Sequence, residues 1–177
     1  MGLQLIIVVE TNPKCKSDWI YIKDTIDTFY EYDMSNVKIR PVYMGGKYKY
    51  EDKLSEIRNY TNAYAKVSKD NKTNVIYCFD CDDYDIEPDD DGFLNAVNKF
   101  CDNNGYDLVW FCKDIERVYL GKKVADKEKK TESARFKTKK LISGVDVKKL
   151  SEKKYKQGCS NIMNVLDKYL MRKSDNY

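Results

Sequence analysis

The chain has 177 residues and a formal net charge of +3, and a chain of this length is typically a single domain, since domains have roughly 100–200 residues. Hydrophobic residues make up 42% and charged residues 34%, with only 3 Pro and 8 Gly, which excludes a largely disordered chain, collagen and a coiled coil. The absence of histidine excludes His-dependent triads, Cys–His pairs and His-ligated zinc sites. Any chemistry must therefore use carboxylates, Lys, Tyr, Ser or Cys.

Membrane and secretory features are lacking in the sequence. The longest apolar run, residues 5–9, is much shorter than the roughly 18 residues that a membrane span requires. The amino terminus lacks a basic stretch followed by an apolar core and a cleavage site. Several of the six cysteines lie in apolar, strand-like runs rather than in the loops of a small secreted scaffold. We therefore expect a cytoplasmic protein with reduced thiols and no membrane partner.

Four short apolar segments have the pattern of β-strands. Residues 4–9 and 74–79 are continuous β-branched runs, which is typical of strands buried on both faces. Residues 36–43 alternate apolar and basic side chains and include Pro41, which indicates an edge strand or a bulge. A fourth strand is predicted at residues 106–112.

Helical spacing of apolar residues separates these strands. It predicts helices at residues 17–32, 50–67 and 90–100, and a closing helix at 159–171. Strands that alternate with helices predict an α/β three-layer sandwich around a mostly parallel sheet of four strands, or slightly more. We expect one domain, with a core at residues 1–120 and a Lys-rich segment with the closing helix at 121–177.

The small net charge hides two strongly charged segments. Residues 80–116 contain 12 Asp and Glu against 2 Lys, net −10, whereas residues 121–156 contain 14 Lys and Arg against 5 Asp and Glu, net +9. The second segment could bind nucleic-acid phosphates, with Lys122, Lys123, Lys137, Lys139 and Lys140 as candidates. For any single lysine, a solvated surface is the simpler interpretation.

Acidic residues follow three of the four predicted strands. Glu10 closes the first, Asp80 and Asp82 close the third, and Asp114 and Glu116 follow the fourth. Because ligands of parallel sheets bind beyond the carboxyl ends of the strands, these acids could converge on one cation. Carboxylate oxygens suit Mg²⁺ or Mn²⁺. For the more distal acids we prefer a solvated loop. They are Asp83, Asp85, Glu87 and Asp89 to Asp91.

The strand-end motifs resemble a known family. A Glu that closes the first strand and an Asp-x-Asp that closes a later one resemble the Toprim domain of topoisomerases, primases and OLD-type nucleases. Asp114-x-Glu116 is similar to the Ser-x-Glu element of OLD-like nucleases, and the layout resembles the small RloB-like Toprim proteins of bacterial defence loci. The resemblance covers about residues 3–120. Toprim proteins usually have Gly where this chain has Thr11.

The resemblance implies a function and roles for individual residues. Glu10 would be a metal ligand or general acid/base, Asp80 and Asp82 would be Mg²⁺ or Mn²⁺ ligands with a catalytic role, and Glu116, with Asp114, would add further ligands. Asp18 could match an accessory acid. The implied activity is metal-dependent hydrolysis of phosphodiester bonds in DNA or RNA, and the similarity to RloB-like proteins implies a role in a defence system.

Two other interpretations stay open. The acidic edge and the Lys-rich segment could form a non-catalytic module that binds a partner protein or a second copy of the chain. A phosphotransfer receiver domain also uses clustered acids and a Lys, but it fits a lone Glu10 poorly. Convergence of Glu10, Asp80, Asp82 and Glu116 in space would favour the enzyme.

Overall fold

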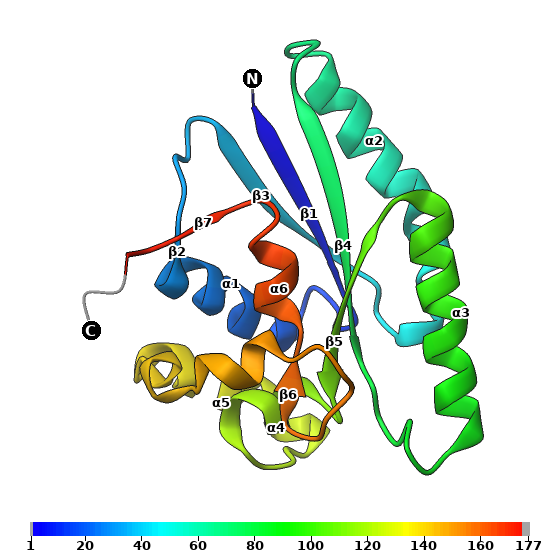
Figure 1. Ribbon diagram of the computed structural model, residues 1–177, viewed down its shortest axis with the longest axis vertical. Coiled ribbons are helices and arrows are strands. Elements are labelled where there is room, and N and C mark those ends of the chain that lie inside the picture. The colour runs from blue at the N-terminus through cyan, green and yellow to red at the C-terminus, as the bar shows by residue number, and fades with distance from the viewer. Residues whose placement is uncertain (1, 175–177) are drawn as a thin grey trace.

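A five-stranded sheet with helices on both faces forms the centre of the computed structural model, which describes residues 2–174 (Figure 1). Residues 175–177 of the predicted C-terminal segment therefore lie outside the described residues. The principal strands are β1 (Leu3–Val9), β3 (Val37–Tyr43), β4 (Lys72–Asp80), β5 (Asp107–Cys112) and β6 (Cys159–Ser160). The helices are α1 (Ser17–Phe29), α2 (Leu54–Ala65), α3 (Pro88–Asn104), α4 (Ile115–Leu120), α5 (Asp126–Thr138) and α6 (Ile162–Leu166). A separate two-stranded ribbon pairs β2 (Tyr30–Glu31) with β7 (Met171–Arg172).

The strand order in the sheet is β3-β1-β4-β5-β6. The first four strands are parallel, and only the short β6 is antiparallel to its neighbour β5. The prediction of an α/β fold with a mostly parallel sheet is therefore confirmed. Because β1 lies between β3 and β4, the carboxyl ends of these three strands meet at the same edge of the sheet.

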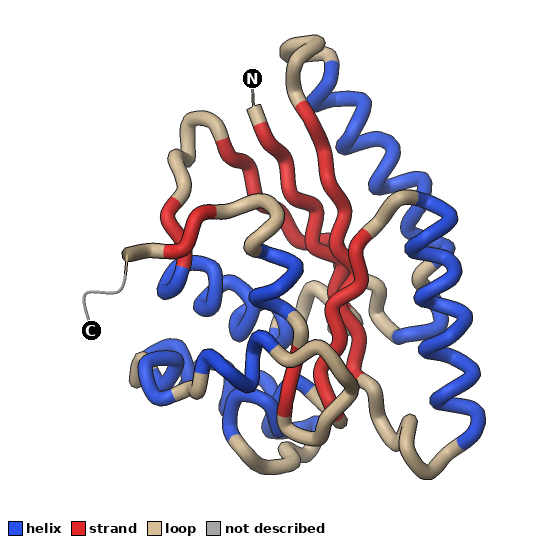
Figure 2. The backbone as a smooth tube through the Cα atoms, viewed as in Figure 1, coloured by secondary structure: helices blue, strands red, loops and turns tan. Residues whose placement is uncertain are grey.

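The sheet is covered on both faces, which makes three layers (Figures 1 and 2). Side chains of β1 alternate between two cores: Leu5, Ile7 and Val9 pack with α1, α4, α5 and α6, whereas Ile6 and Val8 pack with α2 and α3. All five are at most 1% exposed. This two-sided burial explains why the strand reads as a continuous apolar run.

Strand β3 is an edge of the sheet, as Pro41 indicated. Leu3 N–H donates to the Asn36 carbonyl and Met44 N–H donates to the Val9 carbonyl, each at 2.8 Å. Even-numbered residues of β3 therefore direct their backbone groups towards β1, and odd-numbered ones direct theirs outwards. Pro41 lies at an outward position, where its missing N–H breaks no hydrogen bond and discourages a further strand.

Two predicted helices differ from the structure. Helix α1 ends at Phe29 rather than residue 32, because Tyr30 and Glu31 pair with β7. The predicted closing helix at 159–171 is divided into β6, the five-residue α6 and β7. The apolar face on which that prediction rested is nonetheless buried at Ile162 and Leu166.

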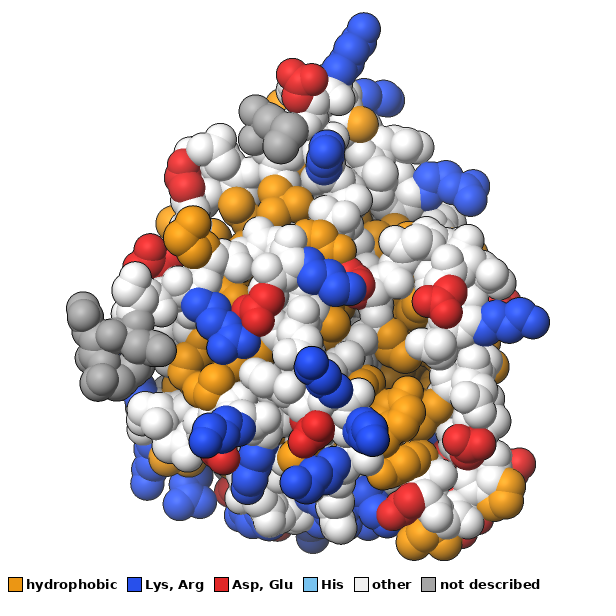
Figure 3. All heavy atoms as spheres, viewed as in Figure 1, with side chains coloured by type: hydrophobic (Ala, Val, Ile, Leu, Met, Phe, Trp, Pro, Cys, Tyr) orange, Lys and Arg blue, Asp and Glu red, His pale blue; other side chains and the backbone are white. Residues whose placement is uncertain are grey.

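The Lys-rich segment contains the 13-residue helix α5, which was not predicted from the sequence. Only Ser133 and Phe136 of this helix are buried. Because so few positions face the core, the helix needs few apolar residues, and its sequence shows almost no apolar periodicity. It packs on α1, and Phe136 stacks edge-on against Tyr21 with ring centroids 4.9 Å apart. Basic side chains gather over the part of the surface that includes α5 (Figure 3).

All six cysteines are free thiols, five of them buried. The Sγ atom of Cys81, the residue after β4, lies 2.8 Å from that of Cys112 at the end of β5. Among residues 2–174, no helix is long and apolar enough to cross a membrane.

Candidate functional site

Two carboxylates meet where β1 and β4 end side by side. Glu10 follows β1 directly and Asp80 is the last residue of β4. Glu10 Oε1 accepts a hydrogen bond of 2.8 Å from the Asp80 backbone N–H. The turn at Gly45 and Gly46 supports this corner, because Gly46 N–H donates to the Glu10 carbonyl at 2.9 Å and both glycines have positive φ angles.

Two further carboxylates reach the same corner from the starts of helices. Asp18 lies in the first turn of α1 and is 8% exposed, and Glu116 lies in the first turn of α4 and is 1% exposed. Asp18 Oδ2 accepts the Thr11 N–H at 3.1 Å, and Asp80 Oδ1 accepts the Ile115 N–H at 2.9 Å. Glu10, Asp18, Asp80 and Glu116 are called the carboxylate cluster below.

Burial and mutual repulsion raise the pKa of every member of the cluster. Burial, followed by the charges of Asp18 and Asp82, raises the pKa of Glu10 to about 8. Burial, followed by the charges of Glu10, Asp18 and Glu116, raises the pKa of Asp80. Burial also raises the pKa of Asp18 and brings that of Glu116 to about 7. The charge of Asp18 acts on all three other members, so it lies at the centre of the cluster.

Unpaired polar atoms concentrate around the cluster. Five buried side-chain polar atoms of residues 2–174 lack a hydrogen-bond partner, and four of them belong to Thr11, Tyr21 and Glu116. Both carboxylate oxygens of Glu116 are among them. Burial, and then the charge of Glu116, raise the pKa of Tyr21, which places this hydroxyl near that carboxylate. Native proteins pair nearly all such groups, so this concentration indicates a place for a further ligand.

Lys129 is the cationic side chain closest to Glu116 in the described part of the chain. It extends from α5, and its Nζ lies 3.7 Å from Glu116 Oε2. The same Nζ is 3.5 Å from Asp126, whose side chain is 99% exposed. Burial lowers the pKa of Lys129, but the charges of Glu116, Asp80 and Asp18 outweigh burial and raise it.

Asp82, expected to be a catalytic ligand, lies beside the cluster rather than in it. Its backbone has a φ of 48°, its side chain is 43% exposed, and Oδ2 is 2.7 Å from Lys47 Nζ. Lys47 also pairs with Asp90 at 2.8 Å. The charge of Asp82 nevertheless raises the pKa of Glu10. Asp82 and Lys47 therefore lie next to the cluster, and their position is called the mouth of the cluster below.

Asp114, also expected to be a metal ligand, has a structural role. It is the N-cap of α4, where its Oδ1 accepts the Arg117 N–H at 2.8 Å. Its Oδ2 accepts a 2.6 Å hydrogen bond from Arg117 Nη1. Both oxygens are therefore engaged by Arg117, and Asp114 would have to give up these hydrogen bonds to bind a cation.

Within residues 2–174, no three Asp, Glu or Cys side chains form a ready-made metal-binding group. The hydrogen bonds explain this geometry, because one oxygen each of Glu10, Asp18 and Asp80 is turned to a backbone N–H. Oε2 of Glu10 and both oxygens of Glu116 are free of such bonds. A cation could therefore be held by these residues only after side-chain rotations that bring their oxygens together.

Five of the six acids expected to be solvated loop residues are exposed, whereas Asp90, in the first turn of α3, has an 18% exposed side chain and pairs with Lys47. Asp83 and Asp85 have side chains 56% and 46% exposed, and they pair with Lys113 at 2.8 and 3.2 Å. The net negative charge of this loop is thus partly neutralised by residues outside the Lys-rich segment.

The candidate nucleic-acid lysines divide into two groups. Lys122 and Lys123 follow α4 closely, and Lys122 pairs with Glu132 at 3.1 Å. The other three, Lys137, Lys139 and Lys140, are exposed at the far end of α5. At 1.5 Å per residue, Lys137 is about 12 Å from Lys129 along the helix axis.

Sequence reasoning missed two residues at this edge, Lys47 and Lys129. A signal existed for Lys47, because Gly45 and Gly46 end a strand parallel to β1 and so deliver the next residues to the same edge. No local signal existed for Lys129, since its position depends on the packing of α5 against α1.

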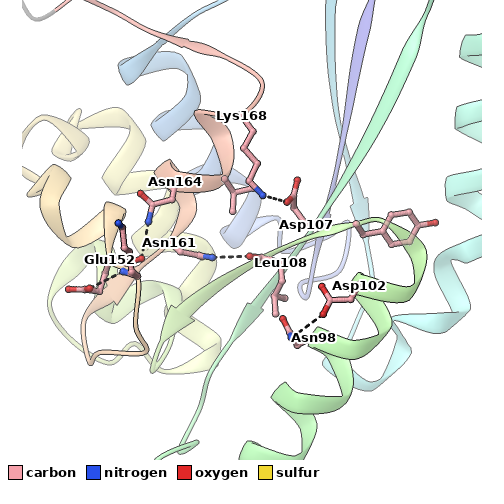
Figure 4. Close-up of a pocket in the computed structure, with 11 residues that line it drawn as sticks. Asn98, Asp102, Asp107, Leu108, Glu152, Asn161, Asn164 and Lys168 are labelled. Carbon is pink, nitrogen blue, oxygen red and sulfur yellow. Dashed lines mark hydrogen bonds and ion pairs between the residues drawn. The ribbon is translucent and has the colours of Figure 1, made fainter.

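A second cavity lies away from the cluster, beside the amino end of β5 (Figure 4). It has a volume of about 330 Å³ and is lined mainly by polar side chains. Asn161 closes the edge of β5 there: its Nδ2 donates to the Leu108 carbonyl and its Oδ1 accepts the Trp110 N–H, both at 2.9 Å. Lys168 pairs with Asp107 at 2.5 Å.

Comparison with protein families, with curated proteins and with solved structures finds no match to this chain.

Proposed function

We propose that the carboxylate cluster binds Mg²⁺ or Mn²⁺ and that the protein is a metal-dependent hydrolase of phosphodiester bonds in DNA or RNA. The observation that supports this most is Glu116, whose two oxygens are buried and accept no hydrogen bond, and whose pKa is raised by burial and by the charge of Asp18. A buried carboxylate without a partner is destabilising unless a proton or a cation compensates its charge.

The donor set fits a hard divalent cation. The charges of three of its four carboxylates act on the single ammonium group of Lys129, so the cluster carries an excess of negative charge when it is ionised. Mg²⁺ prefers oxygen ligands and usually takes only a few carboxylates together with water and substrate phosphate. Glu10 and Glu116 have free oxygens for this purpose, and Asp80 lies between them with one oxygen on the Ile115 N–H.

The chemistry assigns distinct tasks to the residues of the site. A bound divalent cation would activate water and stabilise charge on a phosphodiester. Glu10, which keeps partial exposure and has a pKa of about 8, can hold or release a proton at Oε2 near neutral pH. Lys47 at the mouth can exchange its contact with Asp82 for a substrate phosphate.

The resemblance of the strand-end motifs to Toprim proteins agrees with this proposal, and it alone suggests a role in defence. In the proposal Glu10, Asp80 and Glu116 hold the cation, and Asp82 acts from the mouth. The exposed lysines of α5 would contact the nucleic acid at a distance from the cation.

The test is a Mn²⁺ titration of the wild type, Asp80→Asn and Glu116→Gln, together with cleavage of labelled single- and double-stranded DNA and RNA. Asp83→Asn is the matched control, because it removes the same charge from the exposed loop. The proposal expects binding and cleavage by the wild type and the control, and loss of both in the two cluster variants.

Absence of Mn²⁺ binding by the wild type at millimolar cation would overturn the proposal. It would favour the non-catalytic module that binds a partner through its acidic edge and Lys-rich segment. Mn²⁺ binding without cleavage of any of the four substrates would support the metal site but refute the nuclease activity.

A further inference from the structure

Lys129 occupies the position where a cation would compensate the buried carboxylates. Its Nζ is 3.7 Å from Glu116 Oε2, longer than a direct hydrogen bond, and its side chain is 24% exposed. Charges of Glu116, Asp80 and Asp18 all act on this ammonium group. It therefore compensates three members of the cluster at once without being tightly held by any one of them.

A second acceptor for Lys129 lies in the direction of solvent. Asp126, one turn earlier on α5, is 3.5 Å from the same Nζ, and its side chain is 99% exposed. Lys129 thus joins a buried carboxylate to an exposed one on its own helix. A rotation of the flexible lysine side chain towards Asp126 would remove the positive charge from the cluster and preserve an ion pair.

We propose that Lys129 is a displaceable counter-ion: it occupies the carboxylate cluster in the metal-free protein and must leave towards Asp126 when a divalent cation binds. This inference rests on the proposed metal site and adds its regulation. The free energy of cation binding then includes the cost of displacing Lys129. Lys129 therefore sets the cation concentration at which the site becomes occupied.

The electrostatic consequence can be estimated. A divalent cation and an ammonium group that contact the same carboxylates repel each other even at the dielectric constant of water. A variant without the ammonium group should therefore bind the cation at least about tenfold more tightly. The same variant should be less stable without metal, because the buried carboxylates lose their compensating charge.

The experiment compares Lys129→Met with Lys130→Met in the full chain. Both changes remove one positive charge from α5 and keep the length of the side chain, but Lys130 is exposed and faces away from the cluster contacts. Mn²⁺ affinity is measured by calorimetry, and the urea midpoint is measured in EDTA and in saturating Mn²⁺.

The expected result is tighter Mn²⁺ binding by Lys129→Met alone, with a lower urea midpoint in EDTA that saturating Mn²⁺ restores. If Lys129→Met leaves the Mn²⁺ affinity unchanged or lowers it, Lys129 is not a displaceable counter-ion, and the proposed metal site is not contradicted. Absence of Mn²⁺ binding by both the wild type and Lys129→Met would overturn the metal site and this inference together.

Discussion

The burial of Glu116 predicts an unusual pH dependence of stability in the metal-free protein. Burial, partly offset by the charge of Lys129, raises the pKa of Glu116 from 4.5 to about 7. Between these values the folded protein holds a proton on Glu116 that the unfolded chain has released. Stability therefore falls as the pH rises from about 4.5 to about 7, which is opposite to the usual behaviour of a paired carboxylate.

The size of the effect follows from the shift. About 2.5 pKa units correspond to roughly 3 kcal/mol of unfolding free energy at 1.36 kcal/mol per unit. This contribution is fully present below pH 4.5 and is lost above pH 7. Because a domain is typically stable by about 5–15 kcal/mol, the loss is a large fraction of the total.

The assay is urea unfolding in EDTA at pH 5, 6, 7 and 8 for the wild type and Glu116→Gln. The glutamine has nearly the same shape and no charge, so the stability of the variant should fall less between pH 5 and 8, by about 3 kcal/mol. Glu128→Gln on the exposed face of α5 is the matched control and should follow the wild type. Saturating Mg²⁺ at pH 8 should recover the lost stability in the wild type but not in Glu116→Gln.

Equal pH slopes for the wild type and Glu116→Gln would refute the reasoning. Such a result would mean that Glu116 is solvated or paired in solution. A slope that Glu128→Gln reduces as much as Glu116→Gln does would instead mean that the pH dependence comes from general charge repulsion and not from the cluster.

Three further outcomes separate structural from functional roles. Tyr21→Phe should raise stability in EDTA by up to about 1 kcal/mol in urea unfolding, because the buried Tyr21 hydroxyl has no hydrogen-bond partner. Tyr119→Phe should lower stability by about 1 kcal/mol, because it breaks a 2.6 Å hydrogen bond to Thr25. Asn161→Ala should cost about 2 kcal/mol and speed amide exchange along β5, since both bonds to that strand are lost. Asp114→Ala should cost about 1 kcal/mol as a lost N-cap yet leave Mn²⁺ affinity within about twofold in calorimetry, and a large loss of affinity would return it to the ligand set.

The sheet could be predicted because its strands are buried on both faces. Side chains of β1 and β4 must be apolar at consecutive positions when two cores enclose them, and this is visible in a single sequence. Helix α5 left no comparable pattern, since Ser133 and Phe136 are its only buried residues. The division of the closing segment into β6, α6 and β7 depends on pairing with β5 and β2, which are distant in the sequence.

The site could be predicted to the level of strand ends and no further. Glu10 and Asp80 meet because β1 and β4 are parallel neighbours, which the fold class made probable. Asp82 is only two residues beyond Asp80, but its left-handed backbone turns it to Lys47. The backbone conformation of Asp82 therefore decides whether its carboxylate joins the cluster. The alternation of side chains along the strand does not reveal this conformation.

Charges at the carboxyl edge of the sheet are distributed in two distinct ways. The exposed acids of the β4–α3 loop have lysine partners within 3.2 Å, as Lys113 with Asp83 and Asp85 shows. In the carboxylate cluster, by contrast, the charges of three acids act on Lys129, whose Nζ is 3.7 Å from Glu116, and neither oxygen of the buried Glu116 accepts a hydrogen bond. If the acids only marked loops, the exposed and paired kind would suffice, because burial of unpaired carboxylates lowers stability. In the proposal, a fold that keeps Glu116 buried beside Asp18 and Asp80 therefore gains stability when a cation binds, because the cation compensates the buried charge.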